Sequence, residues 1–533
     1  MREVRFRRLV RPAIVVACGV LLRVAFPDFD LWPLAWVAWV PVLWIVLDEH
    51  TRHAWAWGFL CGVVIQGFGF YWVVPYLQRF AHLPLVAAVP IFLFLIAYQA
   101  VGWTVFCHLL RRIHRTGAVP VTVAAPVLLV AIEFVVPNVF VWYFALSQAW
   151  VIPVIQVAEL TGPLGVSFLL MLSNAALYET AQAWHDGRPL PYRAITFAVV
   201  LIAASLTFGV VRIHQVRTSR DAAPRMTVGV VQANTAIRQQ MRVSDAQDQL
   251  VSYQKLSARL AQSGAELVVW PEGAYPYGFR RNQTIDRSPN DRRRVRNGFD
   301  TPVIFGTLTG GDGAPYPYNS ALVLDKNGAV AGRFDKNILI LFGEYVPFYE
   351  QFKFIKQWIP DVDNFGRGTE VAVLPVESKA GTVRVAPMIC YEDIFPSFGR
   401  RVAGLEPNLL VNLTNDAWFG KTSEPWEHLG LSVFRAVEMR LDLVRATTTG
   451  ISAFVDSTGR VYAKTAPVDP DATANAPAES LLDSVAIQQA RTLYATLGDW
   501  VGWSCLVFST GLVFAPRARR ALGMDPVAAL RAD

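Results

Sequence analysis

The sequence predicts a polytopic α-helical membrane domain of about eight spans, joined to an α/β domain of about 250 residues. Three observations lead to this fold class. Hydrophobic residues make up 53% of the chain and charged residues only 17%, a balance typical of membrane proteins. Long apolar runs fill the chain before residue 214, and one more lies near the C-terminus. Between them, from Met226 onward, short apolar strands alternate with polar and helical segments.

The apolar runs are close to or above the roughly 20 residues that a spanning helix needs. They cover residues 9–26, 31–47, 54–76, 84–110, 118–137, 163–182, 193–213 and 496–515. We therefore expect a transmembrane domain over residues 1–215 and a separate α/β domain over 224–490. A C-terminal span over 496–515 and a cytoplasmic tail over 516–533 would complete the chain.

Arginines in the short segments between runs indicate the orientation, because cytoplasmic loops carry an excess of Lys and Arg. They gather at Arg2, Arg5, Arg7, Arg8, Arg11, Arg111, Arg112, Arg115, Arg188, Arg193, Arg517, Arg519, Arg520 and Arg531. Arg79 is the visible exception. These tracts share one side if the N-terminus is cytoplasmic, which places residues 214–495 outside the cytoplasm. Topology thus explains the +7 net charge better than nucleic-acid binding does.

The polar middle of the chain reads as a layered α/β domain. We expect strands at 226–234, 266–273, 301–309, 382–390 and 408–415, helices at 246–264 and 427–443, and hairpins at 319–336 and 451–465. The first hairpin turns at Asn327-Gly328, the strongest short hairpin signal. In the second helix, His428, Arg435 and Glu438 are expected to be packing and salt-bridge residues.

Three strand ends of this domain each deliver one polar residue: Glu272, Lys336 and Cys390. A thiol becomes a strong nucleophile once it loses its proton, and a carboxylate can accept that proton. A lysine ammonium can stabilise the oxyanion that forms during acyl transfer. Together the three residues are a complete set for acyl transfer without a cofactor. The chain lacks CxxC and HExxH patterns, so we predict no metal.

Four motifs follow one another in this domain: WPEG, FGEYVPF after the lysine, CYEDIFP and NLTNDAWFG. Together they resemble the nitrilase (carbon–nitrogen hydrolase) superfamily. Their place behind seven apparent spans and before an eighth is similar to the apolipoprotein N-acyltransferase family, over essentially the whole chain. The resemblance implies an αββα sandwich on a membrane base, in the bacterial inner membrane, with the catalytic domain facing the periplasm.

The resemblance also implies roles for the residues. Glu272 would be the general base, Cys390 the nucleophile and Lys336 the oxyanion stabiliser. The supporting residues that it implies are Glu344, Tyr391 and Glu392. The implied reaction is ping-pong: Cys390 takes an acyl chain from a phospholipid as a thioester, and the α-amine of an apolipoprotein's diacylglyceryl-cysteine then receives it. The partners would be a phospholipid, a diacylated apolipoprotein and the lipid bilayer, with a monomeric enzyme, no cofactor and no nucleic acid.

The sequence departs from the family at Met241, where relatives often have tryptophan, which leaves the gating role of that loop open. The aromatic segment 344–360 has two readings, a core helix or a lipid-facing arm beside the site. Two other functions also remain open. One is a membrane-bound nitrilase-type amidase, in which water attacks the thioester. The other is a membrane scaffold with a decayed domain, which would require the loss of Glu272, Lys336 or Cys390, and none is lost.

Overall fold

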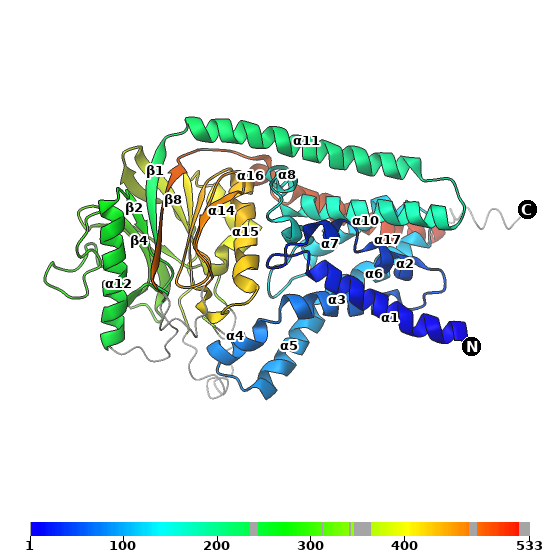
Figure 1. Ribbon diagram of the computed structural model, residues 1–533, viewed down its shortest axis with the longest axis horizontal. Helices are drawn as coiled ribbons and strands as arrows, with labels where there is room; N and C mark the ends of the chain where they lie inside the picture. The colour runs from blue at the N-terminus through cyan, green and yellow to red at the C-terminus, as the bar shows by residue number, and fades with distance from the viewer. Residues whose placement is uncertain are drawn as a thin grey trace, which may run out of the picture. The chain divides into compact units, whose positions relative to one another are not determined.

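The computed structural model describes residues 2–234, 243–311, 313–340, 343–345, 364–467 and 477–521 (Figure 1). The chain forms two compact units. The first, helical unit consists of Met1–Tyr71, Pro90–Val210 and Asp499–Asp533. The second, α/β unit consists of Trp72–Val89 and Val211–Gly498.

The helical unit is built from apolar helices and short 3₁₀ turns. They are α1 (Arg2–Arg23), η1 (Trp32–Trp36), α2 (Val40–Leu47), α3 (Ala54–Gly69), α5 (Leu85–Gln99), α6 (Val101–His114), α7 (Val121–Val135), η2 (Phe144–Gln148), α8 (Ile152–Ile155), α9 (Ala158–Thr161), α10 (Pro163–His185), α11 (Tyr192–Ala222) and α17 (Trp500–Ala521). Of these, α5 begins and α11 ends in the α/β unit. A Cβ at Gly58 would lie 2.4 Å from the carbonyl oxygen of Trp103, so the glycine permits the close approach of α3 and α6.

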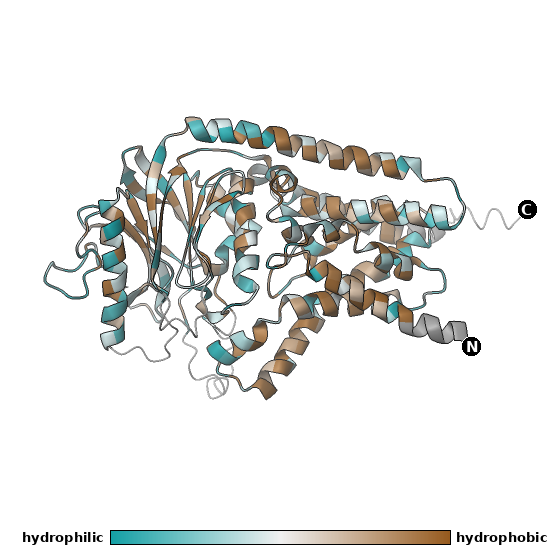
Figure 2. Cartoon of the chain, in the orientation of Figure 1, coloured by the Kyte–Doolittle hydropathy of each residue, from teal (hydrophilic) through white to brown (hydrophobic). Residues whose placement is uncertain are grey.

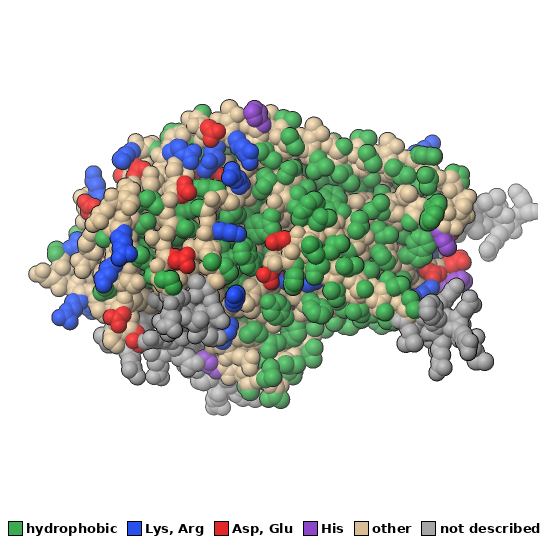
Figure 3. All heavy atoms as spheres, viewed as in Figure 1, with side chains coloured by type: hydrophobic (Ala, Val, Ile, Leu, Met, Phe, Trp, Pro, Cys, Tyr) green, Lys and Arg blue, Asp and Glu red, His purple; other side chains and the backbone are tan. Residues whose placement is uncertain are grey.

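Large apolar side chains remain on the surface of this unit. Phe94 is 73% exposed, Val507 71% and Trp503 60%. Hydropathy colouring shows the same apolar character along these helices (Figure 2), and hydrophobic atoms cover most of the visible face of the helical unit (Figure 3). A soluble monomer rarely exposes so much contiguous apolar surface, so this surface indicates a lipid or protein environment.

Among the described residues, fewer helices than the expected eight have the length and composition to cross a membrane. By length and composition, three described segments qualify: Leu85–His114, Pro163–His185 and Tyr192–Ala222. A fourth is gained if the bent pair Ala54–Gly69 and Val73–Phe80 is one span. Other apolar runs form shorter helices among the described residues. For example, α7 is confined to 15 residues between Pro120 and Pro137, because a helix tends to end before the residue that precedes a proline.

Two β-sheets form the centre of the α/β unit. The seven-stranded sheet has the order β13-β1-β2-β4-β5-β6, with β3 pairing with β4, and the six-stranded sheet has the order β12-β11-β10-β9-β8-β7. The strands are β1 (Arg225–Gln232), β2 (Leu267–Val269), β3 (Tyr275–Arg280), β4 (Val303–Gly310), β5 (Tyr318–Leu324), β6 (Val330–Asp335), β7 (Leu374–Ser378), β8 (Gly381–Ile389), β9 (Leu409–Thr414), β10 (Leu443–Thr447), β11 (Ala453–Val455), β12 (Val461–Lys464) and β13 (Glu479–Ala486). Both expected hairpins are confirmed, since β5 pairs antiparallel with β6 and β11 with β12.

Helices cover the outer faces of the two sheets (Figure 1). The helices and 3₁₀ turns of the α/β unit are α4 (Val73–Phe80), α12 (Val243–Gln262), η3 (Cys390–Ile394), α14 (Pro396–Ala403), η4 (Asp416–Trp418), α15 (Glu424–Met439) and α16 (Leu493–Leu497). The apolar face of α12 packs on the first sheet through Tyr253 and Leu256, which join Trp270 and Phe305 in one core cluster. On the other side, α15 lies against the second sheet. The layers run helix, sheet, sheet, helix, which confirms the α/β part of the predicted fold.

Candidate active site

A cavity of about 890 Å³ opens within the α/β unit. Its polar lining includes all three residues of the predicted triad, Glu272, Lys336 and Cys390, together with Glu344 and Asn319. Aromatic side chains from α4 and from the turn after β9 line another part of it, namely Tyr76, Phe80, Trp418 and Phe419. The cavity therefore combines a compact charged group with an apolar wall, as in a site for an amphipathic substrate.

Lys336 is at the centre of the charged group. It follows β6 directly and is fully buried, and its Nζ donates to Glu272 Oε1 at 3.0 Å and to Glu344 Oε1 at 2.9 Å. Asn319, at the start of the neighbouring β5, donates from Nδ2 to the same two oxygens at 2.7 and 2.9 Å. The backbone N–H of Ile340 donates to the second oxygen of Glu344 at 2.9 Å. One cation and one amide thus hold two carboxylates in fixed positions.

The charges of Lys336, Glu272 and Glu344 shift the pKa values of the lysine and of Glu272. Burial alone would lower the pKa of Lys336, but Glu272 and Glu344 outweigh it and hold that pKa well above its usual value. Burial raises the pKa of Glu272, against the opposing effect of Lys336 and with a further rise from Glu344. A carboxylate with a raised pKa is a better proton acceptor, which suits a general base.

Cys390 begins the turn that follows β8. Its backbone φ of 53° lies in the left-handed region, which is rare for a residue other than glycine. Burial raises the pKa of its thiol well above the usual value, and Glu272 adds to the rise, whereas Lys336 opposes it. The resting thiol is therefore protonated at neutral pH, and it could act as a nucleophile only if a base accepted this proton. A strained residue between a strand and a helical turn is a common placement for a nucleophile.

Glu392 ties this turn to the end of the lysine strand. Its fully buried carboxylate accepts the backbone N–H of Ile389 at 2.7 Å, of Asn337 at 2.5 Å and of Ile338 at 3.2 Å. Burial raises its pKa to about 8, although the three N–H donors oppose the rise. Its contacts join the segment before Cys390 to the segment after Lys336, so Glu392 sets the distance between them.

The side chain of Tyr391 points away from the carboxylate of Glu392. Its hydroxyl donates to Glu424 Oε1 at 2.8 Å, and its ring stacks on the imidazole of His428 with centroids 4.9 Å apart. His428 in turn bonds to Asp393 at 2.9 Å, and Arg435 contacts Glu438 at 2.5 Å. The packing and salt-bridge roles expected for His428, Arg435 and Glu438 are therefore confirmed.

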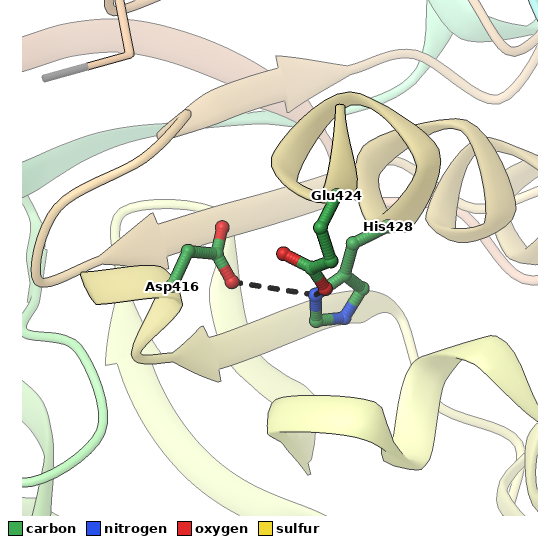
Figure 4. A group of neighbouring side chains, drawn as sticks. All are labelled: Asp416, Glu424 and His428. Carbon is green, nitrogen blue, oxygen red and sulfur yellow. Dashed lines mark ion pairs between the residues drawn. The ribbon is translucent and has the colours of Figure 1, made fainter. Parts of the chain in front are cut away.

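One group of described residues could by geometry hold a metal ion: Asp416, Glu424 and His428, whose ligand atoms lie within 4.8 Å of one another. Figure 4 shows Glu424 and His428 on one helix, facing Asp416 on the adjacent turn. Asp416 already has a cationic partner, because Arg445 Nη2 donates to its Oδ2 at 2.9 Å. Burial first, and then Asp416, raise the pKa of Glu424 to about 8, so this carboxyl carries little negative charge at neutral pH. The fit to a metal is therefore poor.

Two expectations lie outside the described residues: Met241, and residues 346–360 of the aromatic segment. Conversely, the structure adds two residues, Asn319 and Glu424, that the sequence analysis did not predict as parts of the site. Asn319 opens a strand and Glu424 opens a helix, and in the sequence neither differs from many other polar residues at such positions. Only the folded arrangement shows what they contact.

The fold and the site together define a carbon–nitrogen hydrolase domain, and residues 227–476 match the family described as carbon-nitrogen hydrolase. Residues 18–176 match the apolipoprotein N-acyltransferase N-terminal domain. The chain is 31% identical to the apolipoprotein N-acyltransferase of Geobacter metallireducens, over 92% of each chain. It is 27% identical to that of Photobacterium profundum, over 94% of each. The chain belongs to the apolipoprotein N-acyltransferase family.

Among solved structures, the amidase from Nesterenkonia sp. AN1 matches 49% of this chain and 90% of its own, with 18% identity and a TM-score of 0.34.

Proposed function

We propose that this protein transfers an acyl chain from a phospholipid to the α-amine of the diacylglyceryl-cysteine at the N-terminus of an apolipoprotein, through a thioester on Cys390. The observation that carries the proposal is the cavity that Cys390 shares with the Glu272–Lys336–Glu344 group and an aromatic wall. The names of relatives that match nearly the whole chain support the choice of acceptor.

In the first half-reaction, Glu272 takes the proton of Cys390 as the sulfur attacks the ester carbonyl carbon of the phospholipid. A C–S bond forms, and the carbonyl oxygen becomes an oxyanion, stabilised by the Lys336 ammonium and the backbone N–H of Tyr391. When the tetrahedral intermediate collapses, the ester C–O bond breaks. The departing alkoxide takes the proton from Glu272 and leaves as a lysophospholipid.

In the second half-reaction, the neutral α-amine of the apolipoprotein attacks the thioester carbonyl carbon. Glu272 accepts a proton from the attacking nitrogen, the C–N bond forms and the C–S bond breaks. The thiolate of Cys390 then recovers the proton from Glu272. The products are an amide on the apolipoprotein and the free enzyme, so atoms and protons balance without a cofactor.

The exposed apolar helices support a membrane location for this chemistry. We place the helical unit in the bacterial inner membrane as about eight spans, with the catalytic domain facing the periplasm and the enzyme acting as a monomer. In that arrangement a donor lipid and a lipid-anchored acceptor reach the cavity from the bilayer. Glu344, Tyr391 and Glu392 support the triad by holding Lys336 and the nucleophile turn.

Incubation of the purified protein with phospholipid and a diacylated lipopeptide tests the proposal, with products followed by mass spectrometry. We expect a triacylated lipopeptide and a lysophospholipid in equal amounts. Cys390→Ala lowers the rate by at least about 10⁴-fold, since the nucleophile is lost. Persistent transfer by Cys390→Ala would refute the thioester mechanism.

The same incubation separates a second candidate, a nitrilase-type amidase, which the match to carbon–nitrogen hydrolases favours. In that case water would attack the thioester, and free fatty acid would form in place of the triacylated lipopeptide. Equal fatty-acid release with and without the lipopeptide would favour the hydrolase.

A further inference from the structure

Helix α15 presents a polar stripe to the turn that carries the nucleophile. Glu424, His428 and Ser432 are spaced by four residues and therefore share one face of the helix. All three are buried. The turn that they face is η3, Cys390–Ile394, so this stripe lies directly behind the catalytic cysteine.

The stripe contacts two side chains of the turn. Tyr391 donates its hydroxyl to Glu424 and stacks on His428 at an interplanar angle of 12°. Asp393 bonds to His428 Nε2 through Oδ1 and accepts the hydroxyl of Ser432 on Oδ2. His428 is the one described residue that touches both Tyr391 and Asp393 by these contacts, so it fixes their relative positions.

A second set of contacts holds the turn from the sheet. Arg445, on β10, donates to Asn412 Oδ1 at 2.8 Å and lies 3.4 Å from Asp393 Oδ2. Asn412, on β9, donates from Nδ2 to the carbonyl oxygens of Cys390 at 3.0 Å and of Met388 at 3.2 Å. The carbonyl oxygen of Cys390 is thus held by Asn412. Asn412 in turn is held by Arg445, which also contacts Asp393.

The backbone conformation of Cys390 needs such support. A left-handed φ persists at a non-glycine residue only where the surroundings enforce it. The contacts of Tyr391, Asp393 and Asn412 together fix the residues on both sides of that dihedral. If they loosened, the thiol and the N–H of Tyr391 would both move relative to Glu272 and Lys336.

We propose that His428 is a positioning residue for the acyl-transfer site, which, together with Glu424, holds Tyr391 and Asp393 so that the strained nucleophile turn stays in its reactive conformation. This inference rests on the proposed function. His428 is not among the residues that line the cavity, so we place its effect in the turn that it contacts.

The charges around His428 support a hydrogen-bonded cation rather than a metal ligand. It faces Asp393 of η3, Asp416 of η4, Glu424 of its own helix and Arg445 of β10. Burial and Arg445 would lower its pKa, but the two aspartates outweigh them and raise it to about 9. A protonated imidazole donates from both nitrogens and cannot bind a metal.

The test compares alkylation and transfer in matched variants of the full-length protein. The rate at which iodoacetamide alkylates Cys390, located by mass spectrometry, reports the position and activation of the thiol independently of any lipid. We expect His428→Leu to slow this alkylation about tenfold at pH 8. It should also lower kcat of acyl transfer at least tenfold and leave KM within twofold of wild type. His428→Gln restores a donor toward Asp393 and should recover most of both rates.

A control on the same helix separates positioning from folding. Glu438→Gln weakens the buried contact with Arg435, which also donates to the backbone carbonyls of Asp393 and Ile394, and it leaves the hydrogen bonds of the Tyr391 and Asp393 side chains in place. It should lower the melting temperature without changing the alkylation rate. The inference fails if His428→Leu behaves like Glu438→Gln, with lower stability and normal alkylation.

A second pair keeps the test decisive if His428→Leu does not fold. Tyr391→Phe and Glu424→Leu each remove one side of the same hydrogen bond, so the double variant should be no slower than the slower single variant. If the rate losses of the two single variants multiplied in the double variant, the inference would be overturned. So would a metal retained in stoichiometric amount by the wild type and lost from His428→Gln. If the wild type transfers no acyl chain, the proposed function fails. The alkylation rates still decide whether His428 positions Cys390.

Discussion

At the scale of single residues, the site depends on a side chain that carries no charge. Asn319 donates from one nitrogen to Glu272 and to Glu344, and it is buried beside Lys336. Two carboxylates that share one lysine repel each other, and the amide offsets part of that repulsion by donating to both. Against the rise that burial causes, Asn319 lowers the pKa of Glu272 and so helps to keep it ionised, as the general base proposed for this site must be.

Replacing Asn319 by aspartate tests this reasoning. A third carboxylate raises the pKa of Glu272 further, so the acidic limb of the pH–rate profile of acyl transfer should move to higher pH. The rate at pH 7 should fall at least about tenfold, which corresponds to the loss of a hydrogen bond to a charged group. Asn327→Asp, at the hairpin turn of the same sheet, is the matched control and should leave the profile in place. An unshifted acidic limb in Asn319→Asp would contradict the role.

At the scale of elements, an ion pair joins the end of α11 to the second sheet. Arg220 donates to both oxygens of Asp442, at 2.8 to 3.1 Å. Asp442 is fully buried and also accepts the N–H groups of Ser457 and Ala486. One carboxylate thereby connects α11, β13 and the loops beside β10 and β11.

Removing the cation should destabilise this junction strongly. Arg220→Leu leaves Asp442 buried without its countercharge, which costs about 3 kcal/mol in the free energy of unfolding. Arg217→Leu changes an exposed arginine one turn earlier on the same helix and should cost less than about 0.5 kcal/mol. Thermal or denaturant unfolding in detergent measures both. Equal stabilities of the two variants would show that the pair contributes nothing.

The elements also show how far the sequence could predict the fold. Strands with strong apolar runs and the turn at Asn327-Gly328 were predicted, because their signals are local. Strand β10 was missed, since its residues follow the helical pattern of α15 directly. Strand β13 was missed as well: it pairs with β1 more than 200 residues away, and no local pattern indicates such pairing.

The residues of the candidate site likewise fall into those that the sequence could predict and those that it could not. Glu272, Lys336 and Cys390 could be predicted because each follows an apolar strand and the set is chemically complete. The partners Asn319 and Glu424 could not, because their roles depend on distances that only the packed sheets and α15 create. Fewer described helices than predicted spans reach spanning length for a related reason: hydropathy records apolar length but not where prolines end a helix.

At the scale of the whole molecule, buried groups around η3 make stability depend on pH. Burial raises the pKa of Glu392 to about 8, and burial with Asp416 raises that of Glu424 to about 8. Despite burial, the aspartates raise that of His428 to about 9. In each case the folded protein binds protons more tightly than the unfolded chain does. Stability from these groups is therefore fully present at low pH and is lost as pH rises through the raised values.

We therefore expect these three groups to lower the melting temperature of the full-length protein in detergent progressively between about pH 5 and pH 9. Glu424→Gln keeps the shape of the neutral acid but cannot lose its proton, so the fall between pH 5 and pH 8 should be shallower in this variant than in the wild type. Glu479→Gln, on β13 and away from η3, should follow the wild-type curve. Parallel curves for the wild type and Glu424→Gln would show that Glu424 titrates in the folded protein as it does in water, because then neither state would bind its proton preferentially.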